Sequence, residues 1–93
     1  MTPETITNLK EQATTALVEY GNSNRGVLEI FDLVNKYLEE SGANNPNGGP
    51  GEIIRRRETQ VGELLNHCIK SLNKAQIKKV EKLLIHIAKF GNN

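Results

Sequence analysis

The sequence predicts an all-α protein, an antiparallel up-down-up-down four-helix bundle, from three observations. Apolar residues recur at three- and four-residue steps in four separate segments, the spacing that places them on one face of a helix. Glycine, asparagine and proline interrupt this pattern between the segments. No segment shows the alternation of apolar and polar residues that is typical of a strand. A chain of 93 residues is expected to form a single domain, and short turns favour antiparallel neighbours.

The first helix is expected over residues 3–20. Thr2 can cap it, Pro3 suits the first helical position, and Glu4 complements the positive end of the helix dipole. Gly21 is expected to end it. Its predicted buried face consists of Ile6, Leu9, Ala13, Ala16, Leu17 and Tyr20.

The second helix is expected over residues 25–40, after a polar turn at 22–24 whose Asn24 supplies the cap. Its apolar stripe consists of Val27, Ile30, Phe31, Val34 and Leu38, with Tyr37 on the edge. Residues 42–51 contain four glycines, two prolines and three asparagines, which predicts a flexible loop. This loop lacks the lysine and serine or threonine that close a phosphate-binding P-loop.

The third and fourth helices are expected over residues 52–72 and 74–90. Asn73 and Gln76 have the spacing of a capping box at the start of the fourth helix. The predicted buried residues are Ile54, Val61, Leu64, Leu65, Cys68, Ile69 and Leu72 in the third helix, and Ile77, Val80, Leu83, Leu84, Ile87 and Ala88 in the fourth.

No residue is assigned to catalysis, to a cofactor or to a metal, so the sequence predicts a protein that is not an enzyme. Cys68 lies among core positions, where a thiol is expected to be inert. His67 and His86 lie on different helices, and two histidines without a companion cysteine or carboxylate cluster make a poor metal site.

A cytoplasmic location is expected. Residues 1–10 lack a basic start followed by an apolar run, and no apolar stretch approaches the ~20 residues that span a bilayer. A single cysteine cannot form an intrachain disulfide, which suits a reducing compartment.

The charge is divided between the two halves of the chain. Residues 1–51 carry seven acids and three bases (net −4), whereas residues 52–93 carry four acids and nine bases (net +5). The arginines at 55–57 begin one helix and the acids at 39–40 end another, where the helix dipole disfavours each. Antiparallel packing would let the two clusters neutralise each other, or would leave two arginines for a partner's carboxylates or phosphates.

Lysines also follow one another at four-residue steps in the fourth helix, opposite its apolar stripe. Either this row is a solvated face, or it docks on an acidic protein or an anionic surface. The functional hypothesis assigns partner binding to Arg55, Arg56, Lys74, Lys78 and Lys82. Nucleic-acid binding is disfavoured because the net charge is only +1 and no aromatic residues are interleaved with the lysines.

Three strings resemble the small immunity proteins of the enterocin A immunity type, which protect bacteria against their own pediocin-like bacteriocins. These strings are Val27-Leu28-Glu29-Ile30, the Gly49-Pro50 turn before Ile53-Ile54-Arg55, and residues 76–84. The resemblance implies an antiparallel four-helix bundle. It also implies cytoplasmic neutralisation of the toxin at its membrane receptor complex, with the third and fourth helices recognising the partner.

The sequence therefore predicts a non-enzymatic protein-binding bundle, with bacteriocin immunity as its named form. The alternatives are a phage- or plasmid-encoded inhibitor or regulator of a host protein, and a nucleic-acid-associated helical protein. A structural or adaptor domain that pairs with itself, for instance as a homodimer, is a further alternative.

Overall fold

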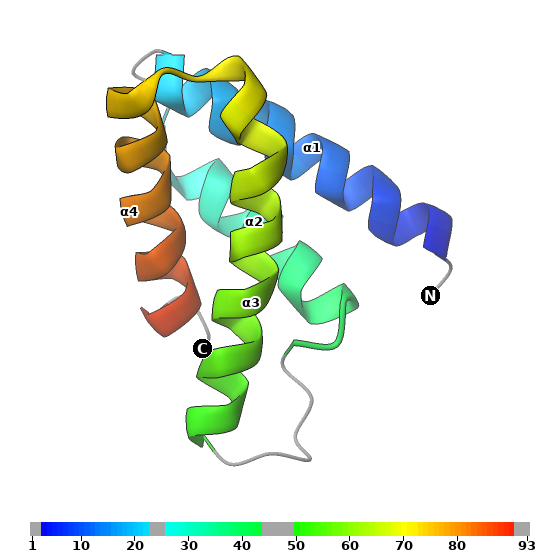
Figure 1. The fold of residues 1–93 in the computed structure, drawn as a ribbon. Coiled ribbons are helices and arrows are strands. Elements are labelled where there is room, and N and C mark those ends of the chain that lie inside the picture. The colour runs from blue at the N-terminus through cyan, green and yellow to red at the C-terminus, as the bar shows by residue number, and fades with distance from the viewer. Residues whose placement is uncertain (1–2, 23–25, 44–49, 91–93) are drawn as a thin grey trace.

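The computed structural model describes residues 3–22, 26–43 and 50–90, and these residues form an all-α four-helix bundle (Figure 1). Its α-helices are α1 (Pro3–Asn22), α2 (Leu28–Glu40), α3 (Pro50–Cys68) and α4 (Lys74–Phe90), with a short 3-10 helix, η1 (Ile69–Ser71), between α3 and α4. No strand occurs among the described residues. The predicted fold class is confirmed.

The bundle consists of two antiparallel hairpins. One is formed by α1 and α2, and the other by α3 and α4 (Figure 1). The α1–α2 hairpin is inclined to the α3–α4 hairpin, and α1 packs against both α3 and α4. This packing gives each helix one buried face, as the apolar stripes require.

The core is mainly aliphatic, and every α-helix contributes to it. Leu17, Ile30, Leu64 and Leu84 are among its largest fully buried side chains. Tyr37, expected at the edge of its stripe, is buried, and its hydroxyl lies 3.0 Å from Gln60 Oε1, to which it donates a hydrogen bond. Burial raises the pKa of Tyr37, and the charge of Glu63 adds to this effect. Uncharged Tyr37 therefore links α2 to α3 as a donor.

Gly21 does not end the first helix as predicted, because α1 continues to Asn22. A Cβ atom at position 21 would lie 2.9 Å from Leu72 Cδ2 and 3.2 Å from Val80 Cγ2. The glycine therefore allows the end of α1 to approach the side chains that flank the α3–α4 connection. Gly21 therefore allows close packing between helices. The sequence did not predict this role, because a glycine at the end of an apolar stripe is also typical of a helix end.

The second helix begins at Leu28, three residues later than the predicted start. Val27, expected in the apolar stripe, precedes the helix and is exposed, although its carbonyl accepts a hydrogen bond from Phe31 N at 2.9 Å. The predicted cap at Asn24 lies outside the described residues. The helix ends as expected near Ser41, and Gly42 adopts a positive φ of 82°.

The third helix differs from its prediction at both ends. It begins at Pro50 instead of residue 52, since proline suits the first turn of a helix. It ends at Cys68, and the following η1 turn leaves Ile69 exposed instead of buried. Residues 44–49, the centre of the predicted flexible loop, lie outside the described part of the chain.

The predicted capping box at the start of α4 is confirmed. Gln76 N donates to Asn73 Oδ1 at 2.9 Å, and Asn73 N donates to Gln76 Oε1 at 2.8 Å. Gln76 Nε2 also donates to Asn22 Oδ1 at 2.8 Å, which connects this cap to the end of α1. The orientation of α4 is therefore fixed at its first turn by side chains from two helices.

Candidate protein-binding surface

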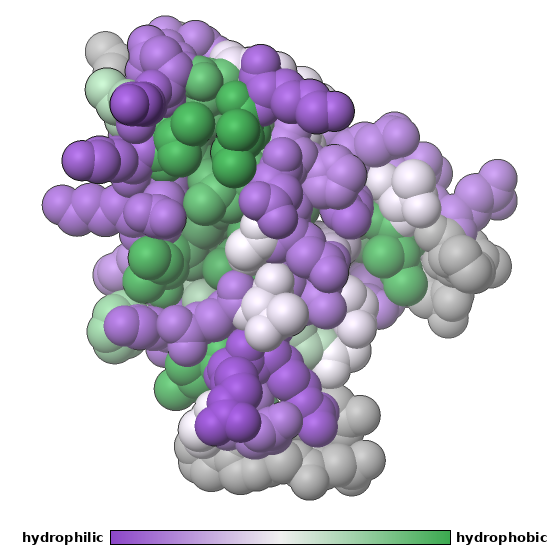
Figure 2. All heavy atoms as spheres, in the orientation of Figure 1, coloured by the Kyte–Doolittle hydropathy of each residue, from purple (hydrophilic) through white to green (hydrophobic). Residues whose placement is uncertain are grey.

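The outer face of α4 carries the predicted lysine row. Lys74, Lys78 and Lys82 are exposed, whereas Val80 and Leu84 on the opposite face are buried in the core. Long hydrophilic side chains project from the side of the molecule where α4 lies, and apolar residues reach the surface between α4 and α3 (Figure 2). The lysines are thus displayed on a helix whose position the core determines.

A hollow of about 590 Å³ lies along the C-terminal half of α4. Its lining repeats at three- and four-residue steps along the helix, and Tyr20 of α1 completes it. Two apolar residues at this end of α4 are exposed: Phe90 retains 67% of its accessible surface and Ile85 retains 41%. The lining consists of Tyr20, Lys79, Lys82, Leu83, Ile85, His86, Lys89 and Phe90.

Aromatic rings shape this hollow. The ring centroid of His86 lies 5.9 Å from that of Phe31 in an edge-on arrangement and 5.1 Å from that of Phe90. At the other end, Lys79 Nζ lies 4.5 Å from the centroid of the Tyr20 ring, within cation–π range. Aromatic residues and lysines are therefore neighbours in space. The sequence did not show this because Tyr20 and Phe31 belong to the α1–α2 hairpin.

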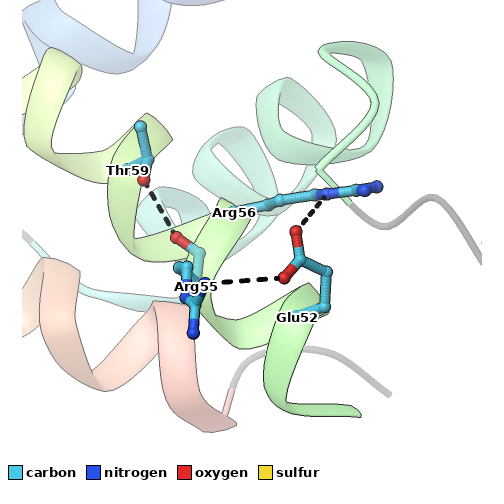
Figure 3. A network of polar contacts seen from close by, with 4 residues as sticks. All are labelled: Glu52, Arg55, Arg56 and Thr59. Carbon is cyan, nitrogen blue, oxygen red and sulfur yellow. Dashed lines mark hydrogen bonds and ion pairs between the residues drawn. The ribbon is translucent and has the colours of Figure 1, made fainter. Parts of the chain in front are cut away.

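Arg55 and Arg56 converge on one carboxylate of their own helix. Arg56 Nε lies 3.3 Å from Glu52 Oε1, and Arg55 Nη1 lies 3.8 Å from Glu52 Oε2 (Figure 3). Neutralisation by the acids at 39–40 was one of two alternatives for this cluster, and among the described residues Arg55 and Arg56 form their ion pairs with Glu52 instead. Glu52 lies one helical turn before both arginines, at the i,i+3 and i,i+4 spacings that allow side chains of one helix to pair.

Arg57 is fully buried, although it was predicted to belong to the exposed charge cluster. Its Nε donates to Ala88 O at 2.9 Å and its Nη2 donates to Ile87 O at 2.8 Å, both in the last turn of α4. Nη2 also donates to Asn35 Oδ1 of α2 at 2.7 Å. Burial lowers the pKa of Arg57 from its ordinary value. The negative end of the α4 dipole stabilises a cation at this position. Through its hydrogen bonds, Arg57 of α3 therefore connects α3 to both α4 and α2.

The structure does not bring the five predicted partner-binding residues into one cluster. Arg55 and Arg56 line a shallow hollow with Ser41–Ala43 at the end of α2. The contacts of Arg57 place this part of α3 beside the last turn of α4, whereas Lys74 begins α4. The axial distance from Lys74 to Ala88 is roughly 20 Å at 1.5 Å per residue. Lys82 alone among the five lines the large hollow.

Cys68 occupies the core position that its place in the sequence predicted. Cys68 is fully buried, and its Sγ lies 4.0 Å from Thr14 O. His67 and His86 lie on different helices, as expected, and both are exposed, although Phe31 and Phe90 flank His86. Within residues 3–22, 26–43 and 50–90, no three metal-ligating side chains come together.

The Cys68 thiol should be inert in the folded protein and should make stability depend on pH. Burial raises its pKa from an ordinary 9.0 to about 11, so the folded state keeps the proton to a higher pH than the unfolded state. This contribution to stability is complete below about pH 9 and is lost as the pH rises towards 11. Urea unfolding should show wild type losing on the order of 1–2 kcal/mol more than Cys68→Ala across this range.

Labelling with a thiol reagent gives an independent measurement of the same property. Modification of Cys68 at pH 8 should follow the urea unfolding curve. Rapid labelling of the native protein, or equal pH dependence in wild type and Cys68→Ala, would contradict the assigned environment.

No helix in the described part of the chain combines the length and apolarity needed to cross a bilayer. Comparison with models of known protein families, with curated proteins and with solved structures finds no match for this chain.

Proposed function

We propose that this protein is a non-enzymatic, protein-binding helical bundle that neutralises or regulates its partner through the exposed face of α4. The lysine row Lys74, Lys78 and Lys82 supplies the charge, and the exposed residues Ile85 and Phe90 supply apolar contact area. The partner surface is acidic with an apolar centre.

One observation carries this proposal: the outward side of α4 displays apolar residues beside lysines, in addition to the apolar stripe that the helix buries in the core. Its inward face is fully occupied, since Val80, Leu84, Ile87 and Ala88 are all buried. Yet Phe90 and Ile85 remain exposed beside the lysines, and large exposed apolar groups rimmed by polar residues mark interaction sites.

Replacing Lys74, Lys78 and Lys82 together by glutamate should abolish partner binding and leave the fold intact, because the three side chains are exposed. The partner is first captured from the producing cell and identified by mass spectrometry, and its affinity is then measured with purified proteins. Reversal of three rim charges should weaken binding by at least about a hundredfold. Circular dichroism and urea unfolding establish that the variant is folded.

The matched control reverses three lysines on the other elements, Lys10, Lys36 and Lys70, which gives the same net charge change. We expect this control to bind the partner nearly as well as wild type. Equal losses in both triple variants would mean that net charge alone drives the association. A folded α4 variant with undiminished affinity would place the functional surface elsewhere.

Bacteriocin immunity is the specific form of this activity that the sequence resemblance favours, and it places the protein in the cytoplasm. The partner is then the membrane receptor complex of a pediocin-like toxin. The chain should protect a sensitive bacterium when expressed inside it, and the α4 triple variant should not. If the wild-type chain gives no protection against such toxins, regulation or inhibition of another host protein takes its place.

Binding to nucleic acid is the competing activity, because the structure places lysines beside aromatic rings. However, Lys79 covers the Tyr20 ring, which leaves Phe90 as the exposed phenyl ring of this hollow, and one such ring does not provide the series of stacking sites that single strands bind. Affinity for random DNA or RNA should be at background level at physiological salt. Tight binding that falls by about 0.7–0.9 log units per tenfold salt for each phosphate contacted would overturn the proposed function.

A further inference from the structure

The hollow beside α4 follows three turns of the helix, from Lys79 to Phe90. Leu83 and Phe90 are apolar and seven residues apart, and they form one side of its lining with Tyr20. Lys82 and Lys89 are also seven residues apart and form the other side. Residues at i, i+3, i+4 and i+7 share a helix face, so the hollow has a mainly apolar rim, which Lys79 joins at one end, and a mainly basic rim, which Ile85 joins.

These two rims define the chemistry of an occupant. Seven residues of an α-helix rise by about 10.5 Å, so Lys82 and Lys89 match two carboxylates at positions i and i+7 of a second helix alongside. Apolar side chains at i+3 or i+4 of that helix would then face Leu83 and Phe90. The volume of about 590 Å³ is within the range of ordinary binding pockets.

We propose that the hollow binds an acidic amphipathic helix of the partner protein, with carboxylates at i and i+7 and an apolar residue at i+3 or i+4. This inference rests on the proposed function and names the element of the partner that α4 recognises. The partner's helix lies along the C-terminal half of α4, and its apolar residue enters between Leu83, Phe90 and Tyr20.

A helix fits this site better than a membrane surface does. Peripheral helices bind lipid by inserting an apolar face below the headgroups, but the buried face of α4 is committed to the core. The other apolar residues of α4, together with lysines, line a concave surface. Such a surface fits a side chain that protrudes from a partner helix. The charge of the lysine rim selects acidic residues over basic ones.

A synthetic peptide tests this proposal without the natural partner. The peptide has about 16 residues, enough for a marginal helix, and carries Glu at i and i+7 with Leu at i+3 and i+4. A control peptide has the second Glu at i+5, which places it on the opposite side of the helix at equal net charge. Affinity is measured by fluorescence anisotropy, and amide chemical shifts of the labelled protein locate the site.

We expect the matched peptide to bind about tenfold more tightly than the i+5 peptide, with shift changes at Lys82, His86 and Lys89. Phe90→Ala and Lys89→Glu should each weaken the matched peptide by about tenfold or more. Leu28→Ala and Lys36→Glu, which alter exposed residues of α2 in the same way, should leave its affinity unchanged.

Four results would overturn the inference: no binding of the matched peptide at about 1 mM, equal binding of both peptides, shift changes on another face, or no effect of Phe90→Ala and Lys89→Glu. Phe90-dependent binding to vesicles of anionic phospholipid without peptide binding would assign the hollow to a membrane surface instead.

Binding of the captured natural partner distinguishes failure of this inference from failure of the proposed function. If the triple lysine variant loses that partner while Phe90→Ala and Lys89→Glu keep it, the helix-binding inference fails and the proposed function stands.

Discussion

Replacement of Arg57 by methionine should destabilise the protein by about 3–5 kcal/mol, the loss expected when one member of a buried polar network is removed. The guanidinium donates hydrogen bonds to Ile87 O, Ala88 O and Asn35 Oδ1. Methionine keeps much of the side chain's length and apolar contact but leaves these acceptors without their donor. Because a domain of this size is stable by only about 5–15 kcal/mol, urea unfolding should show a large shift of the midpoint.

Arg56→Met is the matched control, since the same substitution is made one position earlier on the same helix. Its side chain is partly exposed and pairs with Glu52, so the cost should be about 1 kcal/mol or less. Arg57→Lys should fall between the two, because an ammonium group keeps the charge but lacks the planar fork that reaches both helices. Equal effects of Arg57→Met and Arg56→Met would show that the buried contacts contribute nothing.

Replacement of Leu84 by alanine should destabilise the protein by about 2–5 kcal/mol, the usual range for a buried leucine. Leu84 is buried in the core on the inward face of α4, a helix that packs against α1, α2 and α3. The lost methyl groups remove burial and leave a cavity that the surrounding helices cannot fill completely. The loss is measured by urea unfolding followed by circular dichroism.

Leu28→Ala makes the same chemical change at a side chain that retains 81% of its accessible surface. It should change the free energy of unfolding by no more than about 0.5 kcal/mol. Leu65→Ala should cost less than Leu84→Ala, because Leu65 packs against the core but is only partly buried. A cost for Leu28→Ala that matches the cost for Leu84→Ala would contradict the assigned core.

The fold class and most of the core follow from the pattern of apolar residues alone. Apolar residues at helical spacing specify which face of each helix must be buried, and burial of these faces is the main driving force of folding. For this reason Leu17, Ile30, Leu64 and Leu84 were all predicted from periodicity and all lie in the core. The Asn73–Gln76 capping box was equally predictable, because both of its hydrogen bonds form within three residues.

The contacts of the charged residues, by contrast, depend on how the helices pack against one another. Arg55, Arg56 and Arg57 look alike in sequence, but their orientations around α3 differ by about 100° per residue. One orientation turns Arg57 into the core towards the end of α4, while the other two leave Arg55 and Arg56 beside Glu52. Local spacing does not reveal this, because the acceptors of Arg57 lie 22 to 31 residues away.

The hollow and the role of Gly21 also depend on contacts between residues that are far apart in the chain. The lysine row follows from the spacing within α4, but the hollow also needs Tyr20 from α1, and Phe31 from α2 supports it by packing against His86. Gly21 matches a helix stop in sequence, yet Leu72 and Val80 lie where its side chain would be. Periodicity reports which face of a helix is buried. The neighbours that this face meets depend on how the two hairpins pack, and that is decided by contacts between residues far apart in the chain.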